Sequence, residues 1–312
     1  AGFDAHGTLA EAAVNETGRG VFEDKAVKNL FACEYVTSNL RHLKTVGIIN
    51  EDPLLGITEI AEPVGVVCGI VPTTNPTSTV IFKSLICLKT RNPIIFSFHP
   101  SAHACSVMAA VVIRDAAIAA GAPEDCIQWL DLKSMYATTA LMKHPGVATI
   151  LATGGNAMVA AAYSCGKPAL GVGAGNVPAY VEKTCVLPRA VNDIVLSKSF
   201  DNGMICASEQ AAIVDTEIYD AFMKEIKRFK VYFVNKEEKA KLETFMFGAV
   251  AYSDNVNAAK LNPNVVGKPA TWIAEQAGFK VPEDTQIICA ECKEVGPNEP
   301  LTREKLSPVL AV

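Results

Sequence analysis

Apolar and polar positions follow two different periods along the chain. Residues 1–45 place apolar side chains at three- and four-residue spacing, as in EDKAVKNLFACEYVTSNLRHL, which is typical of amphipathic helices. From Ile57 onward, short continuous apolar runs such as PIIFSF and VATILAT alternate with longer helix-like stretches. Such runs are expected where helices cover both faces of a parallel sheet.

This alternation predicts an α/β fold built from βαβ units. We expect residues 1–183 to form a Rossmann-like nucleotide-binding domain and residues 184–312 to form a second α/β domain. The second domain is predicted to contain helices near 188–199, 216–229 and 235–246 and strands near 210–214 and 286–290. The chain ends on the apolar run SPVLAV with no closing helix, which indicates a fragment of a longer protein.

Charge and hydropathy argue against two kinds of partner. The chain carries 28 basic and 33 acidic residues with no basic block, so we expect no nucleic-acid partner. Two uncharged stretches, 63–82 and 145–166, are long enough to consider as membrane spans. The first contains three prolines and the second contains Gly154-Gly155-Asn156, so both are predicted to be strand–turn–helix segments.

The ten cysteines are expected to be reduced thiols. The sequence opens with no signal-peptide pattern, and several cysteines lie in apolar runs, which favours a cytoplasmic protein with buried thiols. Cys289 and Cys292 form a lone C-x-x-C without further ligands nearby in sequence, so no metal site is predicted.

Cys206 differs from the other cysteines in its position. In SFDNGMICASEQ it follows a polar, glycine-containing turn and precedes the apolar run AAIV. A thiol nucleophile needs exposure and a donor for the oxyanion, and a turn entering a new element supplies part of this. The alternative is that Cys206 is one more small core residue, and no histidine lies near it in sequence.

A glycine pair marks a second candidate site. Gly154 and Gly155 lie in ATGGNAM, between a predicted strand and a predicted helix, where a phosphate could approach the backbone. An ordinary tight turn is the alternative. The usual G-x-G-x-x-G fingerprint is absent in its confirming context, because GVGAG at 171–175 precedes a strand.

The segment VPTTNPTST, residues 71–79, carries a third candidate. Its Thr and Asn side chains could cap the helix that follows, or one could direct an amide at a substrate oxygen. The local sequence favours capping alone.

Taken together, these segments resemble a known family. EPVGVVCGIVPTTNPTS, ATGGNAM, GVGAGN, SFDNGMICASEQ and EKLSP occur in the order and spacing of the aldehyde dehydrogenase superfamily. More narrowly, they resemble the CoA-acylating acetaldehyde dehydrogenase half of bifunctional aldehyde–alcohol dehydrogenases. The resemblance covers nearly all 312 residues and implies an aldehyde dehydrogenase-like fold, incomplete and truncated at both ends.

The resemblance implies a reaction. Cys206 matches the family's nucleophile, which adds to an aldehyde to give a thiohemiacetal. Hydride transfer to NAD then leaves a thioacyl enzyme, and coenzyme A releases acyl-CoA; in fermentation the reaction runs in reverse. The catalytic amide is assigned to Asn75, although hydrolytic relatives carry Asn one place earlier, where this chain has Thr74.

Cofactor-binding positions also follow from the resemblance. Thr153, Gly154 and Gly155 match the phosphate turn of a family that binds NAD without the usual fingerprint. His99-Pro100 falls where hydrolytic relatives carry Lys-Pro at the adenosine ribose, and Glu304 matches the glutamate at the nicotinamide ribose. The implied cofactor-binding set is Thr74, His99, Pro100, Thr153, Gly154, Gly155, Gly173 and Glu304.

One departure from the family selects between two reactions. Hydrolytic members carry ELGGK, whose glutamate activates the deacylating water. Here the matching run is GVGAGN, with Gly171 at the place of that glutamate. We therefore expect transfer to the thiol of coenzyme A in preference to hydrolysis.

Two alternatives remain beside this hypothesis, namely a hydrolytic aldehyde dehydrogenase and a structural, filament-forming module of a bifunctional alcohol dehydrogenase. Relatives continue past EKLSPVLAV with a histidine-containing segment and a strand that bridges subunits. We therefore predict low or no turnover for these 312 residues alone. The expected partners are a small aldehyde or acyl-CoA and further copies of the chain, as a dimer or filament.

Overall fold

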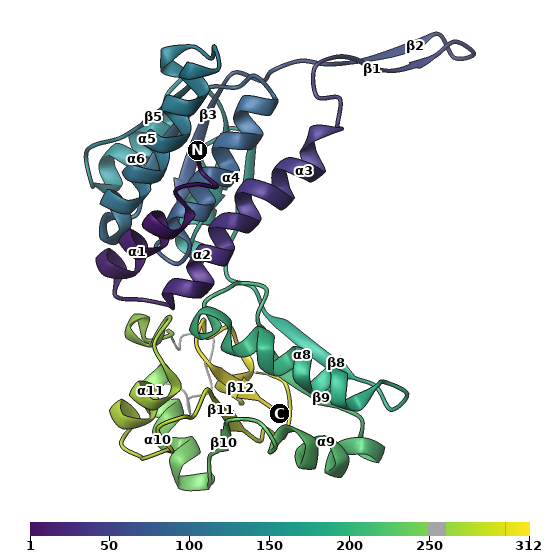
Figure 1. Cartoon of the computed structure of the whole chain (residues 1–312), viewed down its shortest axis with the longest axis vertical. Coiled ribbons are helices and arrows are strands. Elements are labelled where there is room, and N and C mark those ends of the chain that lie inside the picture. Colours follow the sequence, from purple (N-terminus) through teal and green to yellow (C-terminus); the bar gives the residue numbers. More distant parts are fainter. Residues whose placement is uncertain (249–259, 297) are drawn as a thin grey trace. The chain divides into compact units, whose positions relative to one another are not determined.

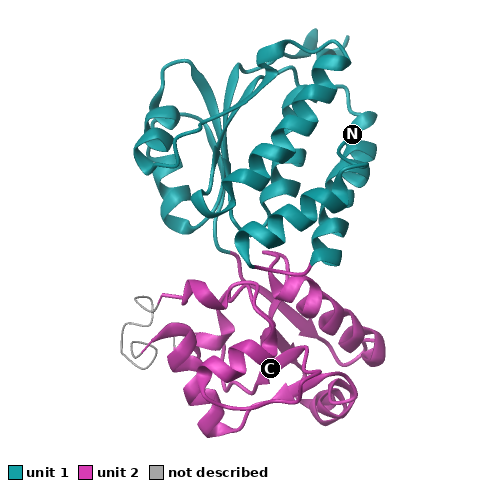
Figure 2. Ribbon diagram, turned by 60° about the vertical axis from the view of Figure 1, so that its left-hand side comes forward, with its two compact units in different colours: residues 1–18, 22–174 teal, residues 19–21, 175–312 magenta. Residues whose placement is uncertain are grey.

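The computed structural model describes all residues except 249–259 and 297, and the chain divides into two compact units (Figure 2). Unit 1 comprises residues 1–18 and 22–174, and unit 2 comprises residues 19–21 and 175–312.

The two units divide between residues 174 and 175, before the predicted domain boundary at residue 183. The strand β8 (Val177–Val181), which we assigned to the first domain, pairs in parallel with β9 (Glu209–Val214) of unit 2. A short continuous apolar run predicts a strand but carries no information about which sheet it joins. The main segment of unit 2 therefore begins at Gly175.

Unit 1 contains a five-stranded parallel sheet in the order β5-β4-β3-β6-β7. The order reverses between β3 and β6, which is the point where doubly wound sheets bind ligands at the carboxyl ends of their strands. The strands are β3 (Val66–Val71), β4 (Ile94–Phe98), β5 (Ile127–Trp129), β6 (Val147–Thr153) and β7 (Ala169–Val172). The connecting helices are α4 (Pro76–Lys89), α5 (His103–Ala119), α6 (Met135–Lys143) and α7 (Asn156–Tyr163).

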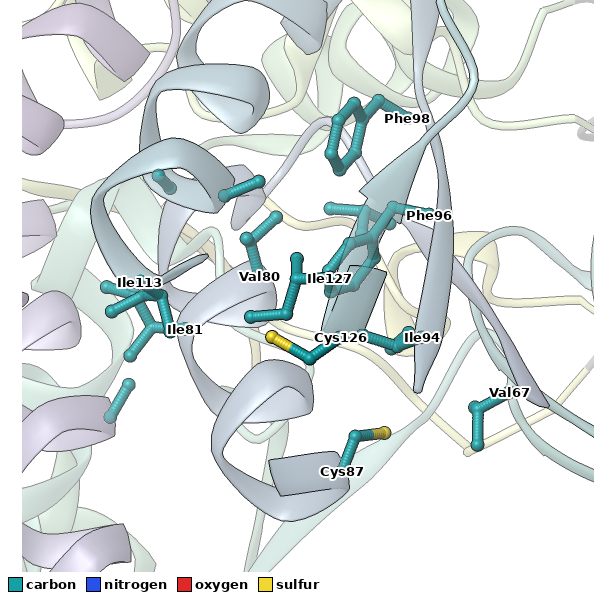
Figure 3. Close-up of a cluster of buried hydrophobic side chains, with 14 of the residues drawn as sticks. Val67, Val80, Ile81, Cys87, Ile94, Phe96, Phe98, Ile113, Cys126 and Ile127 are labelled. Carbon is teal, nitrogen blue, oxygen red and sulfur yellow. The ribbon is translucent and has the colours of Figure 1, made fainter. Parts of the chain in front are cut away.

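Apolar side chains alternate along β3 and bury both faces of this sheet. Val67 and Val71 belong to a core cluster with residues of α4 and α5, and Figure 3 shows Phe96 and Val80 within it. Cys68 and Ile70 belong to a second cluster with residues of α6, β6 and α7. Helices therefore cover both faces, as the continuous apolar runs predicted.

Four further elements of unit 1 precede the sheet. They are α1 (His6–Thr17), α2 (Phe22–Leu30), α3 (Val36–Arg41), joined to α2 by a π-helical turn, and the antiparallel hairpin of β1 (Gly47–Asp52) and β2 (Ile57–Ala61). The helical prediction for residues 1–45 is confirmed up to Arg41. The hairpin extends away from the sheet of unit 1 (Figure 1). Strand β1 was not predicted, because GIINED lacks a clear alternation of apolar and polar residues.

Unit 2 contains a second parallel sheet, in the order β10-β11-β12-β9-β8. Helices α8 and α9 pack on one face through residues such as Val195 and Phe222, and α10 and α11 pack on the other through Leu242 and Ile273. The remaining strands are β10 (Val231–Phe233), β11 (Ile287–Ala290) and β12 (Val309–Ala311). The helices are α8 (Leu187–Ser199), α9 (Tyr219–Ile226), α10 (Lys236–Phe247) and α11 (Ala270–Ala277).

Most of the predicted elements of unit 2 are present. The three predicted helices and the strands near 210–214 and 286–290 are confirmed, whereas β10 and α11 were not predicted. The α/β class with parallel sheets is confirmed in both units.

The stretches 63–82 and 145–166 each contain a strand followed by a helix, as predicted. A different stretch, Pro100–Ala119, is long and apolar enough to cross a membrane. Its residues Ala109, Ala110 and Ile113 are buried in the core cluster beside the sheet, which is the position of a core helix.

Candidate active site

A cavity of about 560 Å³ lies at the carboxyl edge of the sheet in unit 1. It is lined by the ends of β3, β4 and β6, on both sides of the reversal in strand order. Five of the residues predicted to bind the cofactor line this cavity: His99, Pro100, Thr153, Gly154 and Gly155. Residues far apart in sequence thus meet at the place where the fold type binds nucleotides.

The glycine pair forms the entrance to α7. Gly155 is the residue before the helix, and no side chain caps the helix there. A Cβ on Gly155 would meet no atom within 4 Å, so open space adjoins the backbone. The free N–H groups and positive end of a helix N-terminus attract a phosphate, which can approach closely where there is no side chain.

Lys133 and Ser134 are among the lining residues that the sequence analysis did not single out. Lys133 and Ser134 precede α6, and the Ser134 Oγ accepts a hydrogen bond from the Ala137 N–H at 3.1 Å. Lys133 adds an exposed positive charge to the cavity. The available signal was their place after β5, since carboxyl ends of parallel strands share one edge of a sheet.

His99 directly follows the carboxyl end of β4, and Ser101 orients its ring. Its Nδ1 accepts a hydrogen bond from the Ser101 N–H at 3.2 Å and lies 2.8 Å from the Ser101 Oγ. A neutral imidazole that accepts at Nδ1 carries its proton on Nε2. Ser101 therefore orients the His99 ring at the position that the resemblance matches to a lysine of hydrolytic relatives.

Thr74 and Gly173 do not line the cavity among the described residues. The Thr74 carbonyl accepts a hydrogen bond from Lys25. A Cβ at Gly173 would lie 2.6 Å from the Asn156 Oδ1, which places Gly173 against the first turn of α7. The cofactor role of both residues stays a prediction.

Asn75 precedes α4, yet its side chain does not cap the helix. The expectation that this residue acts by capping alone is therefore wrong. Its Oδ1 accepts a hydrogen bond from the Lys28 Nζ at 2.8 Å, while its Nδ2 lies 3.4 Å from the Thr74 Oγ1. The second interpretation, an amide available to a substrate oxygen, is compatible with this geometry.

Cys206 lies in unit 2 and is the only exposed cysteine of the ten, all of which belong to the described residues. It occupies a turn closed by the Ser208 N–H, which donates to the Ile205 carbonyl at 3.0 Å. Among the described residues the Cys206 N–H has no hydrogen-bond acceptor. Cys206 is therefore not a core residue, and its backbone N–H can donate a hydrogen bond to a ligand.

Burial suppresses the reactivity of several other thiols. It raises the pKa values of Cys68, Cys87, Cys105 and Cys292 to about 12. The pKa of Cys289, which is fully buried in β11, is raised even further. A thiol held protonated in this way is a poor nucleophile. Within the described residues, no group of three or more His, Cys, Asp or Glu side chains could hold a metal ion.

The turn before Cys206 is built from three successive residues in the left-handed region. Asp201, Asn202 and Gly203 have φ values of 50°, 53° and 67°. Asp and Asn tolerate this region better than most residues, and contacts hold the conformation. The Asp201 Oδ1 accepts from the Val21 N–H at 2.7 Å, and the Asn202 Nδ2 donates to the Gly267 carbonyl at 3.1 Å.

Gly203 fits where no other residue would. A Cβ there would lie 2.5 Å from the Ser307 carbonyl oxygen and 3.1 Å from the Lys198 carbonyl oxygen. The turn from Asp201 to Gly203 thus packs directly against the segment EKLSP, residues 304–308. Two motifs that the sequence separates by about a hundred residues are in direct contact.

Glu304 lies at the same place in unit 2. Its Oε1 accepts a hydrogen bond from the Gly175 N–H at 3.0 Å, and a Cβ on Gly175 would lie 3.3 Å from the Cys206 carbonyl oxygen. Burial raises the pKa of Glu304, although the Gly175 N–H and Lys198 oppose that shift. The structure therefore brings together two of the predicted functional residues, Cys206 and Glu304.

Two buried lysines, which the sequence analysis did not single out, interact electrostatically with Glu304. Lys198 and Lys305 are fully buried. The Lys305 Nζ donates to the carbonyl oxygens of Gln210, Leu301 and Arg303, and its N–H donates to the Gln210 Oε1 at 3.0 Å. Burial lowers the pKa of Lys198 to about 7 and that of Lys305 well below its ordinary value. Their signal in the sequence was weak, because a lysine is normally exposed.

A cavity at the reversal of a doubly wound sheet, together with an exposed cysteine on a constrained turn, is expected of a nucleotide-dependent enzyme that uses a thiol. The comparison with known families agrees. The profile described as "Aldehyde dehydrogenase family" matches residues 5–259, and the chain belongs to this family.

Individual proteins similar to this chain include an aldehyde-alcohol dehydrogenase and an acetylating aldehyde dehydrogenase. The chain is 72% identical to aldehyde-alcohol dehydrogenase 2 of Entamoeba histolytica, over all of this chain and 36% of that protein. An acetylating aldehyde dehydrogenase from Geobacillus thermoglucosidasius has a structure that matches with a TM-score of 0.92 and 48% identity, over 99% of this chain and 67% of that one. The chain thus spans about a third of the length of the first relative.

A third similar protein was solved with an acyl derivative of coenzyme A. The propionaldehyde dehydrogenase of Rhodopseudomonas palustris, solved with bound propionyl-CoA, matches with a TM-score of 0.84 and 32% identity, over 99% of this chain and 66% of that one. An enzyme of this fold therefore binds an acyl-CoA.

Proposed function

We propose that this chain carries the acylating aldehyde dehydrogenase activity, in which a small aldehyde, coenzyme A and NAD give acyl-CoA and NADH, reversibly. The observation that carries the proposal is the position of Cys206. Among the ten cysteines, all of them described, it is the only exposed one. It lies on the turn from Ile205 to Ser208, and its backbone adjoins Gly175, whose N–H donates to Glu304.

The residues act in the following way. The Cys206 thiol adds to the aldehyde carbonyl, and the resemblance to the family assigns the Cys206 N–H and the Asn75 amide as donors to the new oxyanion. Collapse of the thiohemiacetal breaks the C–H bond and releases a hydride, for which NAD would supply the acceptor. The thiol of coenzyme A attacks the resulting thioester, forms acyl-CoA and returns the Cys206 thiol.

The cavity of unit 1 supports NAD as the cofactor. Its glycine pair leaves open space at the N-terminus of α7, which suits a pyrophosphate, and His99 and Lys133 add polar groups to its lining. In unit 2, the Glu304 carboxylate suits a ribose hydroxyl, because a carboxylate oxygen accepts hydrogen bonds from hydroxyl groups. The preference for NAD over NADP rests on the resemblance to the family.

Gly171 supports transfer to coenzyme A over hydrolysis. It lies in β7, and a Cβ there would approach the Val159 Cγ1 to 2.6 Å and the Tyr163 Cε2 to 2.9 Å. The place of the hydrolytic glutamate is therefore both empty of a carboxylate and closed to one by α7. Without a general base for water, the better nucleophile, a thiol, deacylates the enzyme.

The reaction can be tested by following NADH during incubation with acetaldehyde. NADH formation should be slow for these 312 residues alone. It should require coenzyme A, yield acetyl-CoA, and be lost in Cys206→Ser but not in Cys185→Ser, which changes a half-buried cysteine. Parallel assays with NADP test the cofactor preference. Acetate formation without coenzyme A would favour the hydrolytic alternative.

Self-association is a second proposal, and the hairpin favours it. Leu54 and Leu55 at its tip are 96% and 71% exposed, and Ile48, Ile57 and Ile60 are exposed along its strands. A two-stranded hairpin is marginally stable alone, and apolar residues on its strands indicate a partner surface. We propose a homo-oligomer in the cytoplasm; light scattering of the wild type and of Leu54→Asp/Leu55→Asp tests the assembly.

A further inference from the structure

One face of α2 contacts the loop that contains Asn75. The Lys25 Nζ donates to the Thr74 carbonyl at 3.0 Å, and the Lys28 Nζ donates to the Asn75 Oδ1 at 2.8 Å. Asn29 lies one helical turn after Lys25, and its Oδ1 accepts a hydrogen bond from the hydroxyl of a threonine in α4 at 2.8 Å. Lys25, Lys28 and Asn29 have the i, i+3, i+4 spacing of one helix face, so this face as a whole holds the loop.

The lysine determines which way the Asn75 amide faces. An ammonium group has three donors and no acceptor, so only the amide oxygen can face it. Turning the amide over would place an NH₂ group against the ammonium and lose the hydrogen bond. The Nδ2 is therefore directed away from Lys28, and its contact with the Thr74 Oγ1 is long, at 3.4 Å. Asn75 is presented as a donor.

This arrangement does not serve the helix. An Asn before a helix usually accepts hydrogen bonds from the first turn, which stabilises the helix, and Asn75 makes no such bond. A cation near a helix N-terminus is also unfavourable. Both features favour a negative charge that develops near the amide, because the ammonium polarises the amide and adds positive potential.

We propose that Lys28 is a positioning residue for acyl transfer, which holds the Asn75 amide with its NH₂ group presented to the carbonyl oxygen of the aldehyde or thioester. This inference rests on the proposed function. Lys25, which is 3% exposed, fixes the Thr74 carbonyl and so the backbone that carries the amide. Lys28 itself does not contact the substrate.

The test compares two reactions of Cys206. Acetyl-CoA acylates the thiol through an oxyanion and releases coenzyme A, whereas iodoacetamide alkylates it by displacement of iodide, without an oxyanion. We expect Lys28→Met to slow acetylation, followed by intact mass, between about tenfold and a hundredfold, since one oxyanion donor contributes about 10²–10³ in rate. The rate with iodoacetamide should change less than about twofold.

Further variants separate positioning from a structural role. Asn75→Asp keeps an oxygen for Lys28 but has no N–H, so it should be as slow as Asn75→Ala. Lys28→Met added to Asn75→Ala should cause no further loss, because both remove one interaction. Lys28→Arg should restore most of the rate, and Lys143→Met, at the exposed end of α6, should match the wild type.

Several results would overturn the inference. They are an unchanged acetylation rate in Lys28→Met, losses that add in the double variant, or an equal loss with iodoacetamide. If the wild type itself forms no adduct, the proposed function fails, and the side-chain ¹⁵N–¹H signals of Asn75 decide the positioning role. These signals should shift and broaden in Lys28→Met, and unchanged signals would contradict the inference.

Discussion

The backbone N–H of Gly175 donates a hydrogen bond to the Glu304 Oε1 at 3.0 Å, although 129 positions separate the two residues. Gly175 also lies against the backbone of Cys206, where a Cβ would be 3.3 Å from the carbonyl oxygen. One glycine therefore sets the spacing between the Cys206 backbone and the Glu304 carboxylate. A substituent on Gly175 is tolerated only if the Cys206 backbone moves by a few tenths of an ångström.

Gly203→Ala should destabilise the chain strongly. The left-handed backbone costs an alanine about 1–2 kcal/mol, and its Cβ would lie 2.5 Å from the Ser307 carbonyl oxygen. We expect the free energy of unfolding in urea to fall by at least about 2 kcal/mol. Gly7→Ala, in α1 with open space around it, is the matched control and should be neutral or slightly stabilising. Equal stability of the two variants would contradict this prediction.

Gly155→Ala should weaken cofactor binding and leave the free energy of unfolding nearly unchanged. A methyl group there enters open space beside the N-terminus of α7, so the free energy of unfolding should change by less than about 0.5 kcal/mol. The same methyl group occupies the place proposed for the pyrophosphate. We expect the Kd for NAD, measured by calorimetry, to rise about tenfold or more, equivalent to about 1.4 kcal/mol. An unchanged Kd would place the phosphates elsewhere.

Gly171→Glu should not create a hydrolase. The new side chain would collide with Val159 and Tyr163, and overpacking of this kind costs about 1–3 kcal/mol. We expect lower stability and no acetate formation. The collision predicts coupling: Gly171→Ala should cost less in a Val159→Ala background than in the wild type. Additive costs, or acetate produced by Gly171→Glu, would show that the position opens toward the substrate.

Lys198 should make stability depend on pH in alkaline solution. Burial lowers its pKa from 10.5 to about 7 in the folded chain, so the unfolded chain binds more protons between these values. Its contribution to stability is therefore full above the unfolded pKa and is lost as the pH falls from about 10 to about 7. The slope for one proton is at most about 1.4 kcal/mol per pH unit.

Lys198→Met removes the amine that titrates between these pH values. Between pH 7 and pH 10 the difference in unfolding free energy between wild type and variant should shift steadily in favour of the wild type. Lys83 also has a lowered pKa and remains in both proteins. The pKa of Lys305 is lowered by burial and by Lys198, so the difference reports Lys198 together with its effect on Lys305. Parallel curves for the two proteins would show that Lys198 stays charged when folded.

Sequence patterns predicted the alternation of strands and helices because each short apolar run needs both of its faces buried. The same patterns could not assign β8 to its sheet, since pairing partners are fixed by contacts distant in sequence. The family motifs predicted Cys206 and the glycine pair. The contacts of Asn75 with Lys28 and of Gly203 with Ser307 had no sequence signal, because they join segments whose proximity only the fold creates.

The most direct test of the account is the intact mass of the chain after incubation with acetyl-CoA, beside Cys206→Ser. We predict one acetyl adduct on the wild type, located at Cys206, and none on the variant. An adduct of equal extent on Cys206→Ser, or no adduct on either protein at saturating acetyl-CoA, would contradict the claim that Cys206 is the acyl-accepting nucleophile of this chain.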